Sequence, residues 1–177
     1  MRRGEVLGFR WENVSLSNKA IYVNQTVTRV VGRGITINDP KTPYSRRLLS
    51  LPPSATTLLT GLRIKRKEQM EFMGLDWDES EFAFPNSKGG PINPDTITHA
   101  FKKVVRKIGL DKARFHDLRH THATLMLKEG IHPKIASKRL GHASINITLD
   151  TYSHVLPGMQ EDAALAFEKS LSSVGSI

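Results

Sequence analysis

The stretch RFHDLRHTHATL, residues 114–125, contains three histidines and two arginines. We predict a helix over 117–130, because a glycine at its end is the common residue just past a helix. His116 and Arg119 are three positions apart, so they share one face at the start of this helix. A hydrophobic core does not need this chemistry. The stretch therefore points to a metal, to a phosphate, or to a purely structural use of these side chains.

A phosphate suits the pair formed by His116 and Arg119. Backbone N–H groups at the start of a helix already attract an anion. Arginine adds a permanently charged planar fork that matches phosphate oxygens. Histidine adds a donor whose protonation changes near neutral pH. This pattern indicates contact with a phosphodiester.

Two features resemble metal sites only in part. His116 and His120 have the i, i+4 spacing of the HExxH motif, but the glutamate is missing and Arg119 sets a positive charge beside any cation. The acidic loop over 76–81 could be compared with a two-metal nuclease site, yet acidic side chains in a loop are usually just solvated. We therefore predict no metal and no cofactor. For His120 and His122 we favour a structural role, as polar core residues bonded to backbone.

The composition favours a nucleic-acid partner. The chain has 177 residues, with 26 Lys and Arg against 17 Asp and Glu, and a formal net charge of +9. Such a surplus makes a polyanion the default partner, although a merely solubilising surface is the alternative. The sequence has no apolar run of the ~20 residues that a membrane span needs and no signal peptide, so we predict no membrane partner. A chain without cysteine fits a reducing compartment, and we predict a cytoplasmic protein. The absence of cysteine excludes disulfides, thiolate zinc sites and cysteine nucleophiles.

Strand patterns occur early in the chain and helical patterns dominate the rest. β-Branched, alternating residues predict strands at 20–31, 35–39 and 46–52, and a short strand opens the segment 81–93. Apolar periodicity and proline or glycine boundaries predict the remaining helices, which lie within 1–16 and over 53–74, 94–108, 133–140, 145–155 and 157–173. This order predicts an α+β fold, mostly helical, with a small three-stranded antiparallel sheet on one side.

Two more stretches supply chemistry that fits a phosphodiester. LGHASINITLDTYSHV, residues 140–155, places His142 ten positions before Tyr152. PKTPYSRRLLSLP, residues 40–52, places Lys41 in a predicted turn between strands. Taken alone, Tyr152 would be interpreted as a half-buried core aromatic and Lys41 as a solvated lysine in a turn. Their value lies in the combination with the histidine–arginine cluster.

Four motifs together resemble the catalytic domain of tyrosine recombinases, and the phage and conjugative-transposon integrases are the nearest branch. The motifs are R-R-G-E-V-L-G-F-R-W at 2–11, P-K-T-x-x-S-R-R at 40–47, H-D-L-R-H-T-H-A-T at 116–124 and L-G-H-x-S-I-x-x-T-L-D-T-Y-S-H-V at 140–155. The resemblance implies six catalytic positions, which are Arg2, Lys41, His116, Arg119, His142 and Tyr152.

The resemblance also implies a mechanism. Tyr152 would attack a DNA phosphodiester to give a 3′-phosphotyrosyl bond, which a 5′-hydroxyl from another strand can then reseal. Arg2 and Arg119 would stabilise the charge of the transition state. We expect His116 to take the proton of the phenol and Lys41 to protonate the leaving oxygen. This scheme needs neither ATP nor a metal.

The resemblance bears on domains and partners as well. Residues 1–156 would form the catalytic domain, and 157–177 a C-terminal helix and tail, in which Ala163, Phe167 and Leu171 form a stripe that docks on the same protomer or on a neighbour. Family members usually carry further helices and a core-binding domain before the position of Arg2, so we expect a truncated chain. The expected partners are double-stranded DNA and further copies of the chain, as a tetramer on DNA. Two alternatives stay open: a catalytically weak or inactive DNA-binding remnant and, less favoured, a type IB topoisomerase.

Overall fold

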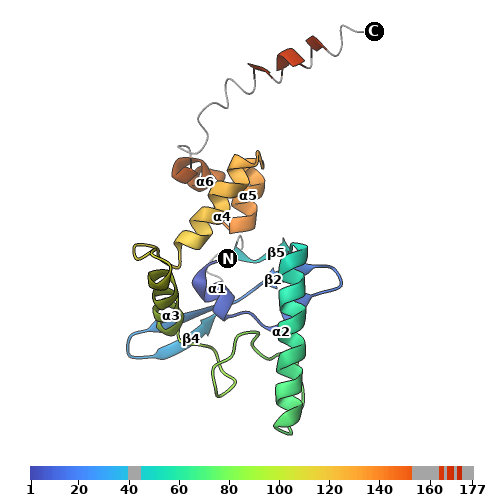
Figure 1. Cartoon of the computed structure of the whole chain (residues 1–177), viewed down its shortest axis with the longest axis vertical. Helices are drawn as coiled ribbons and strands as arrows, with labels where there is room; N and C mark the ends of the chain where they lie inside the picture. Colours follow the sequence, from blue (N-terminus) through green and yellow to red (C-terminus); the bar gives the residue numbers. More distant parts are fainter. Residues whose placement is uncertain (40–44, 153–163, 166, 170, 173–177) are drawn as a thin grey trace.

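The computed structural model describes residues 1–39, 45–152, 164–165, 167–169 and 171–172 (Figure 1). It confirms the predicted α+β class, with a small antiparallel sheet in the first third of the chain and helices over most of the remainder. Lys41 lies outside the described residues. Of the helix predicted over 157–173, the described residues are helical and the others lie outside the description.

The first layer of the fold is a three-stranded antiparallel sheet in the order β1-β2-β5. Its strands are β1 (Val14–Ser15), β2 (Ala20–Val23) and β5 (Arg47–Ser50), and α1 (Arg3–Leu7) and the short 3-10 helix η1 (Trp11–Asn13) precede them. Ile21 of β2 stands opposite Val14 on one side and Leu49 on the other. These side chains form one core with Phe9 and Trp11. Burial of this apolar face fixes the register of the sheet.

The predicted strand over 20–31 is two strands. It breaks at residues 24 and 25, where the Asn24 side chain donates to Asn13 Oδ1 at 2.9 Å and the Gln25 side chain donates to the carbonyl of Gly8. These two amides bond to the N-terminal segment. After the break, β3 (Thr26–Val30) pairs with β4 (Gly34–Asn38), and the two form a separate two-stranded sheet in the described part of the chain.

Helices flank the sheet. The long α2 (Pro53–Phe72) begins with a proline in its first turn and packs Leu59 and Leu62 against the sheet core. The next helix, α3 (Pro94–Lys107), begins after Asn93, whose side chain accepts from the Asp95 backbone at 2.9 Å. The short strand predicted at the start of 81–93 is absent from the described residues, where this segment forms only isolated bridges.

The C-terminal layer is a group of three helices, α4 (Asp117–Lys128), α5 (Pro133–Leu140) and α6 (Ile145–Tyr152), which pack together in Figure 1. They share a second apolar core, made of Ala123, Leu127, Ala136, Leu140 and Tyr152. The bounds of α5 agree with its predicted range. The end of α5 contacts β5, and the carbonyl of Gly141 just after it accepts a hydrogen bond from Arg2, so the three-helix group meets both the sheet and the start of the chain there.

No helix among the described residues is long and apolar enough to cross a membrane.

Candidate active site

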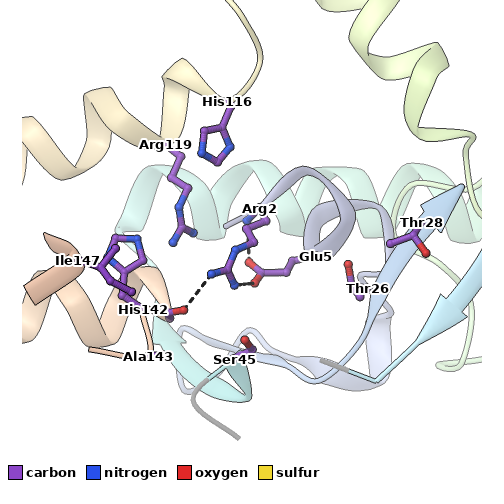
Figure 2. Close-up of a pocket in the computed structure, with 11 residues that line it drawn as sticks. Arg2, Glu5, Thr26, Thr28, Ser45, His116, Arg119, His142, Ala143 and Ile147 are labelled. Carbon is purple, nitrogen blue, oxygen red and sulfur yellow. Dashed lines mark hydrogen bonds and ion pairs between the residues drawn. The ribbon is translucent and has the colours of Figure 1, made fainter. Parts of the chain in front are cut away.

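A cavity of about 610 Å³ opens where the N-terminal helix meets the three-helix group. Four of the six predicted site residues line it: Arg2, His116, Arg119 and His142. Figure 2 shows these side chains converging from α1, α4 and the segment after α5. The cavity therefore brings together residues that are far apart in the sequence. Arg2 and His142, for example, are more than 130 positions apart.

Arg119 is the most buried cation of the cavity. Only 6% of it is exposed, and its Nη2 donates to the carbonyl of Leu140 at 2.6 Å. Its Nη1 is buried and has no hydrogen-bond partner within the part of the chain that the structure describes. Burial, and then the neighbouring Arg2, lower its pKa to about 10, so the guanidinium stays charged at neutral pH. A buried charged donor without a partner is costly, and an anion in the cavity would satisfy it.

Arg2 lines the same cavity as Arg119, from the cap position of α1. Its Nη2 donates to the carbonyl of Gly141 at 3.1 Å, and its Nη1 donates to Glu5 Oε1 at 3.2 Å. Glu5 also accepts from the Arg2 backbone N–H at 2.7 Å, which closes the first turn of the helix. Leu140 and Gly141, whose carbonyls bind the two arginines, are neighbours at the C-terminal end of α5, where carbonyls attract cations.

The close packing of α1 depends on a glycine. A Cβ atom at Gly4 would lie 2.4 Å from Thr26 Oγ1 and 2.5 Å from the Val27 carbonyl oxygen. Any side chain at this position would push α1 away from β3. Because Arg2 and Glu5 are held by α1, Gly4 helps to place them at the cavity.

The two histidines of the cavity both favour the neutral form. Burial, and then the charge of Arg119, lower the pKa of His142 to about 4. Its Nδ1 shares a hydrogen bond of 2.8 Å with the hydroxyl of Thr148, which is fully buried. Partial burial, followed by the neighbouring His120 and Arg119, lowers the pKa of His116. A neutral imidazole can donate one hydrogen bond and accept another.

Tyr152 lies in the core of the three-helix group. It is 3% exposed and does not line the cavity. Its hydroxyl shares a hydrogen bond of 2.7 Å with Nδ1 of His120. Burial raises the pKa of the Tyr152 phenol, and the charge of Arg119 opposes this effect only in part. The phenol therefore resists ionisation and needs a proton acceptor at its oxygen.

The structure corrects two sequence predictions about histidines. His120, predicted to bond to backbone, instead shares a hydrogen bond with the Tyr152 hydroxyl. The role of His116 as acceptor of the phenol proton stays a prediction, and its ring packs edge-on against the His120 ring at 4.8 Å between centroids. His122 is exposed and accepts from Arg139 Nε at 3.3 Å, so it is not a core residue bonded to backbone. The i, i+4 spacing of His116 and His120 was the signal for their shared face.

The acidic loop is held by hydrogen bonds to neighbouring segments, among them bonds from Arg10, Trp11 and Glu12 to its backbone carbonyls. Glu79 accepts from Trp77 Nε1 at 2.9 Å and pairs with Arg63, and Asp78 accepts from the Ser80 backbone at 2.8 Å. Within the described residues, no group of three or more His, Asp or Glu side chains could hold a metal ion.

A comparison with known families decides the identity of the fold. The family model described as "Phage integrase family" matches residues 1–159. The chain belongs to the phage integrase family. The resemblance drawn from the four sequence motifs is therefore confirmed.

Two curated members of the family show how much of a relative this chain covers. The XerC-like tyrosine recombinase of Caldanaerobacter subterraneus subsp. tengcongensis is 29% identical over 174 residues, which are 92% of this chain and 44% of that protein. The ICEBs1 integrase of Bacillus subtilis is 27% identical over 164 residues, which are 93% of this chain and 44% of that protein. The chain thus spans less than half the length of each of these two relatives.

Solved structures of the family share the fold. The Tn1549 transposon integrase, solved in complex with transposon right end DNA, matches with a TM-score of 0.76 at 23% identity, over 97% of this chain and 55% of that one. The XerA recombinase matches with a TM-score of 0.66 at 22% identity, over 94% of this chain and 51% of that one. The α+β arrangement described above is thus the catalytic-domain fold of phage integrases.

Proposed function

We propose that this chain is the catalytic domain of a site-specific DNA recombinase, in which Tyr152 attacks a DNA phosphodiester and forms a 3′-phosphotyrosyl intermediate. The observation that carries the proposal is the buried Nη1 of Arg119, a charged donor without a partner among the described residues, facing a cavity that Arg2 also lines. A single backbone phosphate has the charge and the acceptor oxygens that this pair of guanidinium groups requires.

The cavity suits the transition state of phosphoryl transfer. Attack on phosphorus moves negative charge onto the non-bridging oxygens, and fixed cationic donors stabilise that charge. Arg2 and Arg119 supply such donors, held by the carbonyls of Gly141 and Leu140. The neutral His116 and His142 add hydrogen bonds. Because Tyr152 does not line the cavity, the phenol has to turn toward the bound phosphate before it attacks.

His120, rather than His116, is the proton acceptor that the contacts favour. As the phenolic oxygen forms its bond to phosphorus, the O–H bond breaks and the proton passes to Nδ1 of His120, which already shares the hydrogen bond. The bond from phosphorus to the 5′ oxygen breaks, and that oxygen takes the electron pair. Lys41 remains the predicted donor of the proton that the 5′ oxygen needs. Resealing runs the same steps in reverse with a 5′-hydroxyl of another strand.

The setting of the reaction follows from the charge and the family. A net charge of +9 favours double-stranded DNA as the partner. Strand exchange between two duplexes engages four cleavage sites, so we propose a tetramer of chains on DNA. We further propose a cytoplasmic location, with residues 1–156 as the catalytic unit and 157–177 as a segment that docks in the assembly.

A trapping experiment tests the proposal. The purified chain is incubated with a pool of labelled duplexes that carry a nick beside a randomised segment, so that cleavage releases a short strand and cannot be reversed. We expect a protein–DNA adduct that survives denaturation in the wild type and is lost in Tyr152→Phe. Tyr22→Phe, at an exposed tyrosine of β2, is the matched control and should form the adduct as the wild type does. DNA binding without any adduct would instead support an inactive DNA-binding remnant.

A further inference from the structure

Arg47 is a buried arginine that lies next to the cavity and does not line it. It stands at the start of β5, and only 5% of it is exposed. Its Nε donates to the carbonyl of Arg139 at 2.9 Å, and its Nη1 donates to the carbonyl of Ser45 at 2.9 Å. Its two terminal nitrogens also hold both oxygens of Glu5, at 3.2 and 2.9 Å. The side chain thus joins three separate segments of the fold.

The first of these segments is the C-terminal end of α5. Three consecutive carbonyls there each accept a hydrogen bond from a different arginine. Arg139 accepts from Arg47, Leu140 from Arg119 and Gly141 from Arg2. The contact with Arg47 helps to fix the backbone that holds the two cavity arginines, because the three carbonyls belong to consecutive residues.

The second segment is α1, through Glu5. The Glu5 carboxylate is 4% exposed and binds Arg47 on one side and Arg2 on the other. A buried carboxylate requires such partners. Burial alone would raise the pKa of Glu5, but the hydrogen bonds and charge of Arg47, with the Arg2 backbone N–H, hold it below its usual value. Arg47 therefore keeps Glu5 ionised and in place to orient the Arg2 guanidinium.

The third segment is the end of the stretch that carries Lys41. Ser45 lines the cavity and gives its carbonyl to Arg47. The fit around Arg47 is also tight on the side of α5. A Cβ atom at Gly141, where φ is +70°, would lie 2.7 Å from Arg47 Nη1. The turn after α5 can therefore approach the Arg47 guanidinium this closely only because residue 141 has no side chain.

We propose that Arg47 is a positioning residue for phosphoryl transfer, which sets the placement of Arg2 and Arg119 around the phosphate without touching DNA. The inference rests on the proposed function, since it assigns Arg47 a role in that reaction. A lysine at this position keeps the charge but has no planar fork, so it cannot reach Glu5, Ser45 and Arg139 together.

The test uses Arg47→Lys in the full chain and a nicked duplex that traps the wild type. We expect the single-turnover rate of adduct formation at saturating DNA to fall by about 10- to 100-fold, because small misplacements of catalytic groups cost rates of this order. The DNA concentration for half-saturation should stay within about 3-fold, since Arg47 makes no DNA contact and affinity is dominated by phosphate contacts. Arg63→Lys is the matched control, a partly buried arginine paired with Glu79 and remote from the cavity, and its rate should equal that of the wild type.

Two further measurements cover the case in which Arg47→Lys does not fold. Arg47→Met combined with Glu5→Gln removes both charges of the buried pair and should fold while losing rate in the same way. In the wild type, nitrogen-15 NMR of arginine side chains should show slow exchange for the Arg47 guanidinium, with Arg119 shifting on addition of DNA and Arg47 retaining its protection.

The outcomes separate this inference from the proposed function. If the wild type forms no adduct with any duplex, the proposed function fails. If the wild type reacts and a folded Arg47 variant reacts at the same rate, the positioning role is wrong. A freely rotating, fast-exchanging Arg47 guanidinium in the wild type would overturn the inference as well, because a side chain that is not held cannot position its neighbours.

Discussion

At the scale of single residues, burial decides the chemistry of the site. It leaves Arg119 charged, with a donor that has no partner among the described residues. It also keeps His142 neutral and makes the Tyr152 phenol harder to ionise. Each of these effects prepares one group for a phosphate: a fixed cation, a neutral hydrogen-bond partner, and a nucleophile that loses its proton only to a base in contact.

His120 should be essential for the chemical step. His120→Gln keeps a polar side chain at the phenol but cannot take up a proton at neutral pH, and we expect adduct formation at saturating DNA to slow by about 100-fold or more. His122→Gln is the control, because His122 faces Arg139 on the exposed side of α4 and should leave the rate unchanged. Measurement is by rapid quench of single turnovers. Equal rates of adduct formation in the two variants would show that His120 is not the proton acceptor and would favour His116 instead.

The depressed pKa of His142 predicts a dependence of stability on pH. Its folded-state pKa of about 4 lies below the usual 6.5, so the unfolded chain binds more protons between these values. The free energy of unfolding should therefore fall as the pH drops from about 6.5 toward 4, by on the order of 2 kcal/mol from this group. Urea unfolding followed by tryptophan fluorescence measures it. In His142→Asn the free energy of unfolding should change less with pH. Equal pH dependence in the wild type and the variant would contradict a lowered pKa for His142.

Sequence reasoning reached the residues of the site but not all of their contacts. The four motifs brought Arg2, His116, Arg119 and His142 together correctly, because each motif carries chemistry unusual for a core. Sequence reasoning did not predict the hydrogen-bond partner of the Tyr152 hydroxyl, which is His120. The hydrogen bond to His120 depends on how α6 packs against α4, and no local pattern in either helix records that packing.

At the scale of elements, the end of α5 organises the molecule. Its last carbonyls bind arginines from other parts of the chain, and its apolar face packs against α4 and α6. The helices were predictable from proline and glycine boundaries, as the agreement for α5 shows. The break between β2 and β3 was not, because it results from the Asn24 and Gln25 amides bonding to Asn13 and Gly8.

Leu140 should contribute strongly to stability, as the largest fully buried side chain of α5. It is 1% exposed within the second core. Leu140→Ala should lower the free energy of unfolding by about 2–5 kcal/mol, because it leaves a cavity among packed helices. Leu58→Ala, on the exposed side of α2 at 75% exposure, should change it by less than about 0.5 kcal/mol. Urea unfolding of both variants tests this, and similar small losses would show that the three-helix core is loosely packed.

At the scale of the whole molecule, positive charge and the cavity act together. A second cavity adjoins the first at His116 and is lined by Arg3, Lys102 and Arg114. DNA seated with one phosphate at Arg119 would bring further phosphates toward such cations. The net charge of the chain could be predicted from its composition. The position of Arg3, Lys102 and Arg114 beside the site could not, because it depends on the tertiary structure.

Affinity for DNA should fall steeply with salt. The logarithm of the binding constant should decrease linearly with the logarithm of salt concentration, by about 0.9 per phosphate contacted. Lys102→Gln should reduce this slope by roughly 1, if it contacts a phosphate beside the site. Lys65→Gln, on α2 away from both cavities, is the control and should leave the slope unchanged. Fluorescence anisotropy across a salt series measures both, and equal changes would mean that only total charge matters.

The most direct test of the account is to identify the residue that becomes bonded to DNA. After trapping on a nicked duplex, the adduct is digested with protease and nuclease, and the modified peptide is sequenced by mass spectrometry. The account predicts one nucleotide-bearing peptide, with the 3′-phosphate on the oxygen of Tyr152. Attachment to Tyr22, to Tyr44 or to any other side chain would contradict it.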